Sequence, residues 1–176
     1  VRKQIAGKNL RYHKEDPSVQ KGLDKSREKE WKKWMDFHAG HIIEGEVLDE
    51  LLRDGMSQLP TQWIETDQNE HLKRPGQAHE PDYKSRLVAC GQFEDCEGIR
   101  TDSPTVDVEG FNLLCSFAAC KKLKIKAADI RNAYLQAPSS QKDYIVCGPE
   151  FGLENIGKVA LIHRALYGGK AAGRDF

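Results

Sequence analysis

The chain has 176 residues, of which 39% are hydrophobic and 31% charged, and its formal net charge is zero. This length allows one domain of ordinary size or a piece of a larger protein. The composition excludes a chain that is disordered throughout. The longest uncharged runs fall short of the roughly 20 apolar residues that a membrane helix needs, so we expect no membrane span. The sequence opens on Val1 without a secretory signal, and we expect an excerpt of an intracellular protein, from a cytoplasmic particle or the nucleus.

Charge is unevenly distributed along the sequence. Residues 1–35 contain eleven Lys/Arg and five Asp/Glu, so the remaining residues carry a net charge of minus six. A basic arm before an acidic body is typical of a protein that meets a polyanion such as nucleic acid, although a solvated polyprotein linker explains it equally well. Residues 1–22 show no stable period and are expected to form a flexible basic arm. The five cysteines have no Cys-x-x-Cys spacing, which predicts reduced thiols rather than a zinc site.

Residues 23–58 form a predicted helical segment. A first helix is expected to begin at Asp24 or Ser26 and to stop at Gly40, because four residues fall at helical spacing: Trp31, Trp34, Met35 and His38. We expect the two tryptophans to be packing residues rather than a platform for bases. His38 and His41 are expected to be surface or packing histidines. A second short helix, closed by Gly55, is indicated by four apolar residues: Val47, Leu48, Leu51 and Leu52.

Two β-type runs follow, at residues 62–66 and 83–89. The polar stretch between them contains Pro75-Gly76 and Pro81, and the pattern predicts a β-hairpin with a long loop. Lys84 and Arg86 occupy alternate positions of the second run, so their side chains should project from the same face.

The second half alternates helix and strand signals. A helix is expected to begin at Asp107 or Glu109 and to end at Lys121-Lys122, where cations suit its negative end. Strands are expected at three places: residues 123–130, 144–147 and 159–162. A glycine turn after Tyr167 should lead into a further helix. This order predicts an α+β fold with a largely antiparallel sheet and packed helices.

Asp129 is the carboxylate that we single out for chemistry. It ends an otherwise apolar stretch, and a lone acid in such a place costs free energy to bury unless it binds a cation or a base. The alternative is a structural cap, in which Asp129 accepts hydrogen bonds from nearby backbone N–H groups.

Four blocks of the sequence resemble one family. Residues 83–91 (Y-K-S-R-L-V-A-C-G) are similar to the Y-K-A-R-L-V-A-K-G of the reverse transcriptase domain in copia-type (Ty1/copia) LTR retrotransposons. Residues 98–105 resemble its G-I-D-Y-…-S-P-V block, residues 128–135 its L-D-V-K-N-A-F-L block, and residues 165–174 its A-L-Y-G-L-K-Q-A-P-R block. The blocks occur in the family's order. Together they cover about residues 60–176.

The resemblance implies a right-hand polymerase, with residues 59–176 forming the fingers and the first half of the palm. The intact protein would be an RNA-directed DNA polymerase of a Pol polyprotein. Two Mg²⁺ ions would stabilise the attacking and leaving oxygens of nucleotidyl transfer. Its partners would be an RNA or DNA template-primer, deoxynucleoside triphosphates, and the remaining palm and thumb of the same polyprotein.

The resemblance also assigns site residues. Asp129 would be a catalytic carboxylate and metal ligand, with the backbone carbonyl of Ile130 as a second ligand. Backbone N–H groups of Asn132 and Ala133 would face the triphosphate. Tyr134, where the family more often has Phe, would lie under the sugar and exclude a 2′-hydroxyl. The alternative for Tyr134 is an apolar strand residue.

Residues outside this block complete the implied nucleotide site. Lys84 or Arg86 would contact the phosphates, although an exposed basic strand edge explains either residue nearly as well. Tyr167 and Gly168 would form the floor of the site, where a glycine lets the backbone approach a ligand closely. Gly169, Gly173 and Asp175 depart from the family's pattern.

The family carries further acids in a Tyr-x-Asp-Asp hairpin, and no Asp-Asp pair occurs in these 176 residues. We therefore predict that the chain does not polymerise by itself, because one carboxylate cannot fix two Mg²⁺ ions. The competing hypothesis is a degenerate retroelement remnant or a non-catalytic module that binds nucleic acid or a partner.

Overall fold

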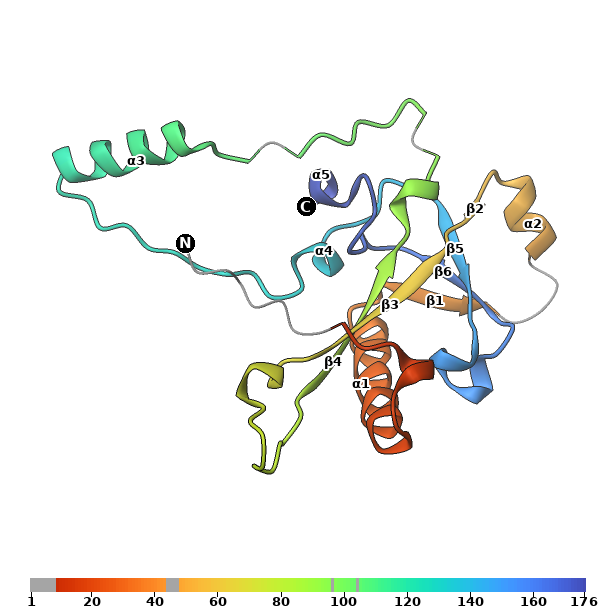
Figure 1. Cartoon of the computed structure of the whole chain (residues 1–176). Coiled ribbons are helices and arrows are strands. Elements are labelled where there is room, and N and C mark those ends of the chain that lie inside the picture. Colours follow the sequence, from red (N-terminus) through yellow and green to blue (C-terminus); the bar gives the residue numbers. More distant parts are fainter. Residues whose placement is uncertain (1–8, 44–47, 96, 104) are drawn as a thin grey trace.

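The structure is a computed structural model, and it describes residues 9–43, 48–95, 97–103 and 105–176 (Figure 1). The helices within these ranges are α1 (Pro17–Asp36), α2 (Leu48–Arg53), α3 (Val108–Cys120), α4 (Ala133–Gln136) and α5 (Ala172–Asp175). The strands are β1 (Gly40–Ile43), β2 (Ser57–Gln58), β3 (Thr61–Asp67), β4 (Tyr83–Ala89), β5 (Asp143–Val146) and β6 (Val159–Ile162).

The strands form two sheets. One has four strands in the order β1-β6-β5-β2, and the other is the β3–β4 hairpin. The pairs β1–β6, β5–β6 and β3–β4 are antiparallel, whereas β2 and β5 run parallel. The predicted α+β class and largely antiparallel pairing are therefore confirmed. The hairpin also has the predicted strands, with Ile64 opposite Arg86 and Thr66 opposite Lys84.

Helix α1 begins earlier than predicted. Pro17 occupies its first turn, where a missing N–H costs nothing, so the helix starts inside the segment expected to be flexible and crosses the expected boundary at residue 22. It ends at Asp36, and His38 adopts a left-handed backbone with φ of 50°. The chain reverses there, so Gly40 opens strand β1 instead of ending the helix.

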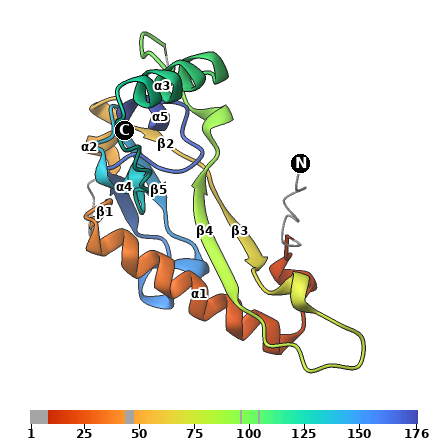
Figure 2. The ribbon, with the colours of Figure 1, turned by 90° about the vertical axis from the view of Figure 1, so that its left-hand side faces the viewer.

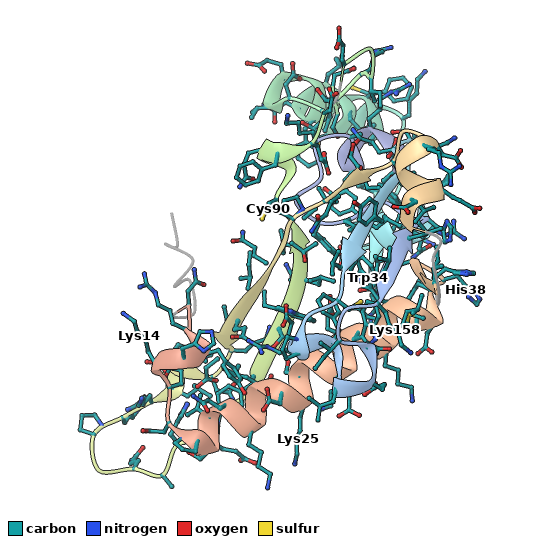
Figure 3. All side chains as sticks on the ribbon, turned by 90° about the vertical axis from the view of Figure 1, so that its right-hand side faces the viewer. Lys14, Lys25, Trp34, His38, Cys90 and Lys158 are labelled. Carbon is teal, nitrogen blue, oxygen red and sulfur yellow. The ribbon has the colours of Figure 1, made fainter. Side chains whose placement is uncertain are left out.

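The main core lies between α1, the four-stranded sheet and strand β4. Trp34 points from the helix into this layer and is 1% exposed (Figure 3). Trp31 stacks on Trp34 at 5.8 Å between ring centroids and meets Phe151 edge-on at 5.0 Å, so the packing interpretation of the tryptophans is confirmed. The other buried members of this cluster are Ala39, Leu59, Leu87, Ala89, Leu135, Ile145, Cys147, Ala160, Ile162 and Leu166.

The hairpin lies along α1 (Figure 2), and polar side-chain contacts hold it there. The Ser26 hydroxyl donates to the carbonyl of Tyr83 at 3.1 Å and accepts from the N–H of Ser85 at 2.8 Å. Arg27 Nε lies 2.6 Å from Glu65 Oε1, and both side chains are largely buried. These contacts fix the hairpin on the helix, and they thereby orient the outward face that carries Lys84 and Arg86.

The predicted strand at 123–130 is wrong. Residues 121–130 are all exposed, and residues 123–130 have no regular structure. An extended apolar segment becomes a strand when its backbone N–H and carbonyl groups pair with a neighbour, and no described strand runs beside this one.

Helix α3 forms as predicted, with Asp107 Oδ1 accepting from the N–H of Gly110, but it stands apart from the sheets in Figure 1. Its large apolar side chains stay exposed: Phe111, Leu113, Leu114 and Phe117.

Strands β1 and β2 and helix α4 were not expected. In contrast, β5, β6 and α5 lie where strand and helix signals predicted them.

Val47, Cys96 and Pro104 lie outside the described residues, as do residues 1–8 of the predicted arm. The four described cysteines are free thiols, and Cys90 and Cys147 are buried. Within the described residues, none of the helices combines the length and the apolar character needed to cross a membrane.

Candidate functional site

The end of strand β4 meets the glycine turn at residues 167–169. The N–H of Ala89 donates to the carbonyl of Tyr167 at 2.7 Å. Gly168 has a φ of +87°, and a Cβ there would lie 2.3 Å from the carbonyl oxygen of Ala89. A glycine is required because any side chain would separate the turn from the strand. Gly168 thus has a structural role in joining the hairpin to the rest of the fold.

An aromatic cluster forms at this junction. Tyr134 on α4 meets Tyr167 edge-on at 4.9 Å between ring centroids, and it meets Phe176 at 6.3 Å. The guanidinium of Arg86 lies over the Tyr167 ring, 5.4 Å from its centroid, within the range of a cation–π contact. The fold therefore brings together Arg86, Tyr134 and Tyr167, which belong to three different sequence blocks.

The two basic residues of β4 differ in their surroundings. Lys84 and Arg86 are both exposed and project from the same face, as the alternation predicts. Arg86 is nearer to Ala89, where the strand joins the turn, and it is the one that touches the aromatic cluster. Lys84 lies further along the strand, toward the hairpin loop.

Asp129 lies on the exposed segment before α4. It has no hydrogen-bond or ion-pair partner among residues 9–43, 48–95, 97–103 and 105–176, and Ile130 is 52% exposed. Asp129 is therefore exposed rather than buried, and the predicted free-energy cost of burying a lone acid does not arise. The cap interpretation gains no support either, since the described backbone donates nothing to this carboxylate. Asn132, three residues on, has a left-handed backbone with φ of 52° and precedes the first residue of α4, Ala133.

The segments around the glycine turn are tied together by polar contacts. The N–H of Lys170 donates to Glu94 Oε2 at 2.6 Å, and its ammonium group donates to the Glu94 carbonyl at 2.8 Å. Two of the three residues that depart from the family's pattern take part in such contacts. Gly173 accepts a hydrogen bond from the Ser103 hydroxyl at 2.9 Å, and the Asp175 carboxylate accepts one from the N–H of Ser140 at 2.9 Å.

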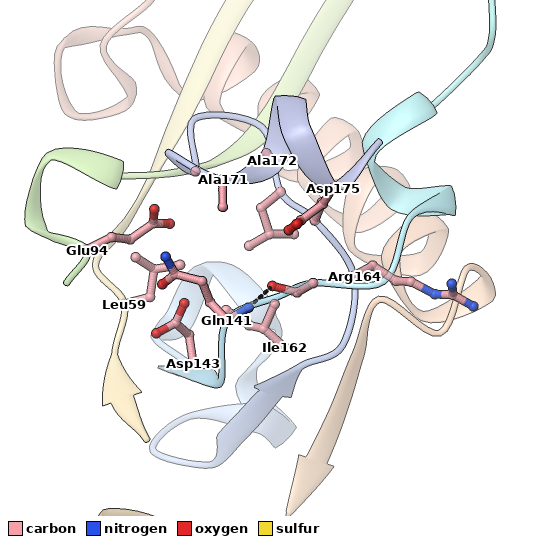
Figure 4. Close-up of a pocket in the computed structure, with 13 residues that line it drawn as sticks. Leu59, Glu94, Gln141, Asp143, Ile162, Arg164, Ala171, Ala172 and Asp175 are labelled. Atoms are coloured by element: carbon pink, nitrogen blue, oxygen red, sulfur yellow. Dashed lines mark hydrogen bonds between the residues drawn. The ribbon is translucent and has the colours of Figure 1, made fainter. Parts of the chain in front are cut away.

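A small cavity of about 20 Å³, roughly the size of one water molecule, lies beneath this turn (Figure 4). Asp143 and Glu94 both line it. Asp143 is 6% exposed, and burial together with the nearby charge of Glu94 raises the pKa of Asp143 to about 6. No local pattern singles out Asp143, because its burial depends on the pairing of β5 and on the turn packed above it.

The other predicted candidates have ordinary surroundings. His41 meets His163 edge-on at 6.0 Å between ring centroids, and the metal-ligating group found in the described residues includes neither His38 nor His41. A packing or surface role for both histidines remains the interpretation.

Comparisons with known proteins identify the family. The family model described as reverse transcriptase (RNA-dependent DNA polymerase) matches residues 51–176, which is more than half of the chain. The chain is also 34% identical over 111 residues to the retrovirus-related Pol polyprotein from transposon TNT 1-94 of Nicotiana tabacum. That match covers 60% of this chain and 8% of the polyprotein, so the chain spans a small part of this relative. No solved structure matches the chain.

Proposed function

The chain belongs to the reverse transcriptase (RNA-dependent DNA polymerase) family, and we propose that it forms the fingers and the first half of the palm of such a polymerase in a copia-type retrotransposon Pol polyprotein. The observation that carries this proposal is the cluster of Arg86, Tyr134 and Tyr167. A cationic strand, an aromatic ring and a glycine turn meet there, and these are suitable walls for an incoming nucleotide.

Each residue of the cluster has a proposed role. Arg86 contacts the triphosphate, and a guanidinium suits phosphate oxygens because its donors can bind two of them at once. Lys84, on the same face, adds positive charge further along the strand. Tyr134 lies under the sugar and disfavours a 2′-hydroxyl, while Tyr167 and Gly168 form the floor. The N–H groups of Asn132 and Ala133 face the phosphates.

The proposed metal ligands are the carboxylate of Asp129 and the carbonyl of Ile130. They fit Mg²⁺, since both are hard oxygen donors and the Asp129 side chain is exposed and unpartnered within the described residues. The bound ions would supply charge stabilisation to the attacking and leaving oxygens. Asp129 belongs to no group of three metal-ligating side chains in the described chain, and we propose that further acids are needed for polymerisation.

The first experiment measures binding of fluorescent deoxynucleoside triphosphates to the chain in the presence of Mg²⁺ and a template-primer. Asp129→Asn should weaken this binding at least tenfold, because the amide removes the negative charge that holds the ion. Asp54→Asn, which also changes an exposed aspartate, should have no effect. Equal nucleotide affinity in the chain and in Asp129→Asn would refute the metal role of this residue.

The second experiment is primer extension by the chain in Mg²⁺. We expect no DNA synthesis, and robust synthesis would contradict the proposed need for further acids. A non-catalytic module that binds nucleic acid is the second candidate, and it is favoured because Asp129 belongs to no group of three metal-ligating side chains in the described residues. That candidate predicts salt-dependent binding of template-primer with no Mg²⁺-dependent binding of nucleotides.

A further inference from the structure

Three metal-ligating side chains meet at the base of the β3–β4 hairpin loop, away from the residues proposed to hold the nucleotide. They are Asp67, Glu70 and His79, and one ligand atom from each lies within 4.8 Å of the others. Asp67 is the last residue of β3, Glu70 begins the short turn of 3₁₀ helix that follows, and His79 comes from the returning limb of the loop. The three donors are brought together by the closure of the loop, so their spacing in the sequence does not reveal them.

The base of the loop is well ordered by hydrogen bonds. Asp67 Oδ1 accepts from the backbone N–H groups of Asn69 at 2.9 Å and of Asp82 at 3.0 Å. The N–H of Gln68 donates to the carbonyl of Asp82 at 2.8 Å, and the Asn69 side chain donates to the carbonyl of Glu80 at 2.9 Å. The first carboxylate oxygen of Asp67 is therefore used by the loop itself, and the second, Oδ2, faces His79.

That second oxygen lies 2.6 Å from His79 Nε2, and the two side chains are 5% and 18% exposed. Contacts with His79, Asn69 and Asp82 therefore hold the Asp67 carboxylate in place at the base of the loop. A proton between an imidazole nitrogen and a carboxylate oxygen occupies the same position that a metal ion takes when it binds both groups.

We propose that Asp67, Glu70 and His79 bind a divalent transition metal of the Zn²⁺ type. One imidazole and two carboxylates suit Zn²⁺, which accepts mixed nitrogen and oxygen ligands, better than Mg²⁺, which prefers oxygen alone. Three protein ligands leave the fourth tetrahedral position for water. Two anionic carboxylates and a neutral imidazole would also balance the charge of the ion.

Binding requires the three ligand atoms, which lie within 4.8 Å of one another, to adopt the separations of a tetrahedral ion. Ligand atoms about 2.05 Å from a tetrahedral ion lie roughly 3.3 Å apart. Nε2 and Oδ2 must therefore separate by about 0.7 Å from their hydrogen-bonded distance of 2.6 Å. His79 lies in the loop rather than in a strand, so this movement leaves the β3–β4 pairing unchanged. The ion would link the two limbs of the loop.

The test is titration of the metal-free 176-residue chain with Zn²⁺ by calorimetry, with Co²⁺ as a spectroscopic probe. We expect one ion per chain and a visible Co²⁺ absorption typical of a tetrahedral nitrogen and oxygen site. His79→Ala and Glu70→Gln should each weaken Zn²⁺ binding at least tenfold and remove the Co²⁺ band. His71→Ala is the matched control, since His71 lies in the same loop outside the cluster and should leave both signals unchanged.

Glu70→Gln keeps the proposal testable if His79→Ala disturbs the loop, because the Asp67 hydrogen bonds do not involve the Glu70 side chain. The absence of stoichiometric Zn²⁺ binding would overturn the proposal, as would binding that survives both ligand substitutions. The Asp67–His79 contact would then serve only to close the hairpin loop. This site goes beyond the proposed polymerase function, and the Zn²⁺ and Co²⁺ titrations do not depend on that function.

Discussion

Substitution of Asp143 by Asn should stabilise the fold at neutral pH. Asp143 is buried beneath the glycine turn, and Glu94 lines the same small cavity (Figure 4). Burial and the Glu94 charge raise its pKa to about 6 from the 3.8 of an exposed aspartate. The folded chain therefore holds a proton between about pH 4 and pH 6 that the unfolded chain has released. The free energy of unfolding must fall as the pH rises through this window, and it levels off above pH 6.

The magnitude follows from the shift. Each pKa unit corresponds to about 1.4 kcal/mol, so a shift of about two units costs at most about 3 kcal/mol at pH 7.5. Asn has the same shape without the charge, and Asp143→Asn should recover most of this amount at pH 7.5 and nothing at pH 4. The measurement is urea unfolding at several pH values, with the exposed Asp54→Asn as the control, which should change stability by less than about 0.5 kcal/mol.

A second variant tests the cause. Glu94→Gln removes the neighbouring charge but keeps an oxygen to accept from the N–H of Lys170. It should lower the pKa of Asp143 and move the loss of stability to lower pH. If Asp143→Asn is no more stable than the original chain at pH 7.5, or if its effect is the same at pH 4 and pH 7.5, the buried charge of Asp143 does not destabilise the fold.

Three further substitutions test the packing. Gly168→Ala should lower the free energy of unfolding by more than about 2 kcal/mol, because its Cβ would overlap the carbonyl of Ala89. Gly76→Ala, with a similar φ and open space around it, should lower it by only about 1 kcal/mol. Equal losses in urea unfolding would exclude the overlap as the cause. Ser26→Ala should lower the free energy of unfolding by about 1–3 kcal/mol, since it removes the acceptor of the part-buried N–H of Ser85. Amide hydrogen exchange should then become faster in β4. Phe117→Ser should change the melting temperature little, because this side chain is 54% exposed on α3, and a large loss would show that α3 packs on the body.

Local sequence patterns were sufficient for most elements of this fold. Alternation predicted β3 and β4 and the common face of Lys84 and Arg86, because side-chain direction in a strand has a fixed period of two. Asp107 and the apolar spacing after it predicted α3, since capping and helical periodicity act within one or two turns. The family resemblance, later matched over residues 51–176, also came from ordered local blocks.

Tertiary structure decided the features that depend on partners distant in the sequence. Residues 123–130 have the composition of a strand, yet they stay irregular because no described strand pairs with them. Asp129 is consequently exposed, and the burial that first drew attention to it does not occur. Conversely, Asp143 acquires a raised pKa, and Asp67 and His79 come within 2.6 Å, only because strand pairing and loop closure place them there. Burial and ligand geometry are properties of contacts between segments, whereas periodicity and capping are properties of each segment by itself.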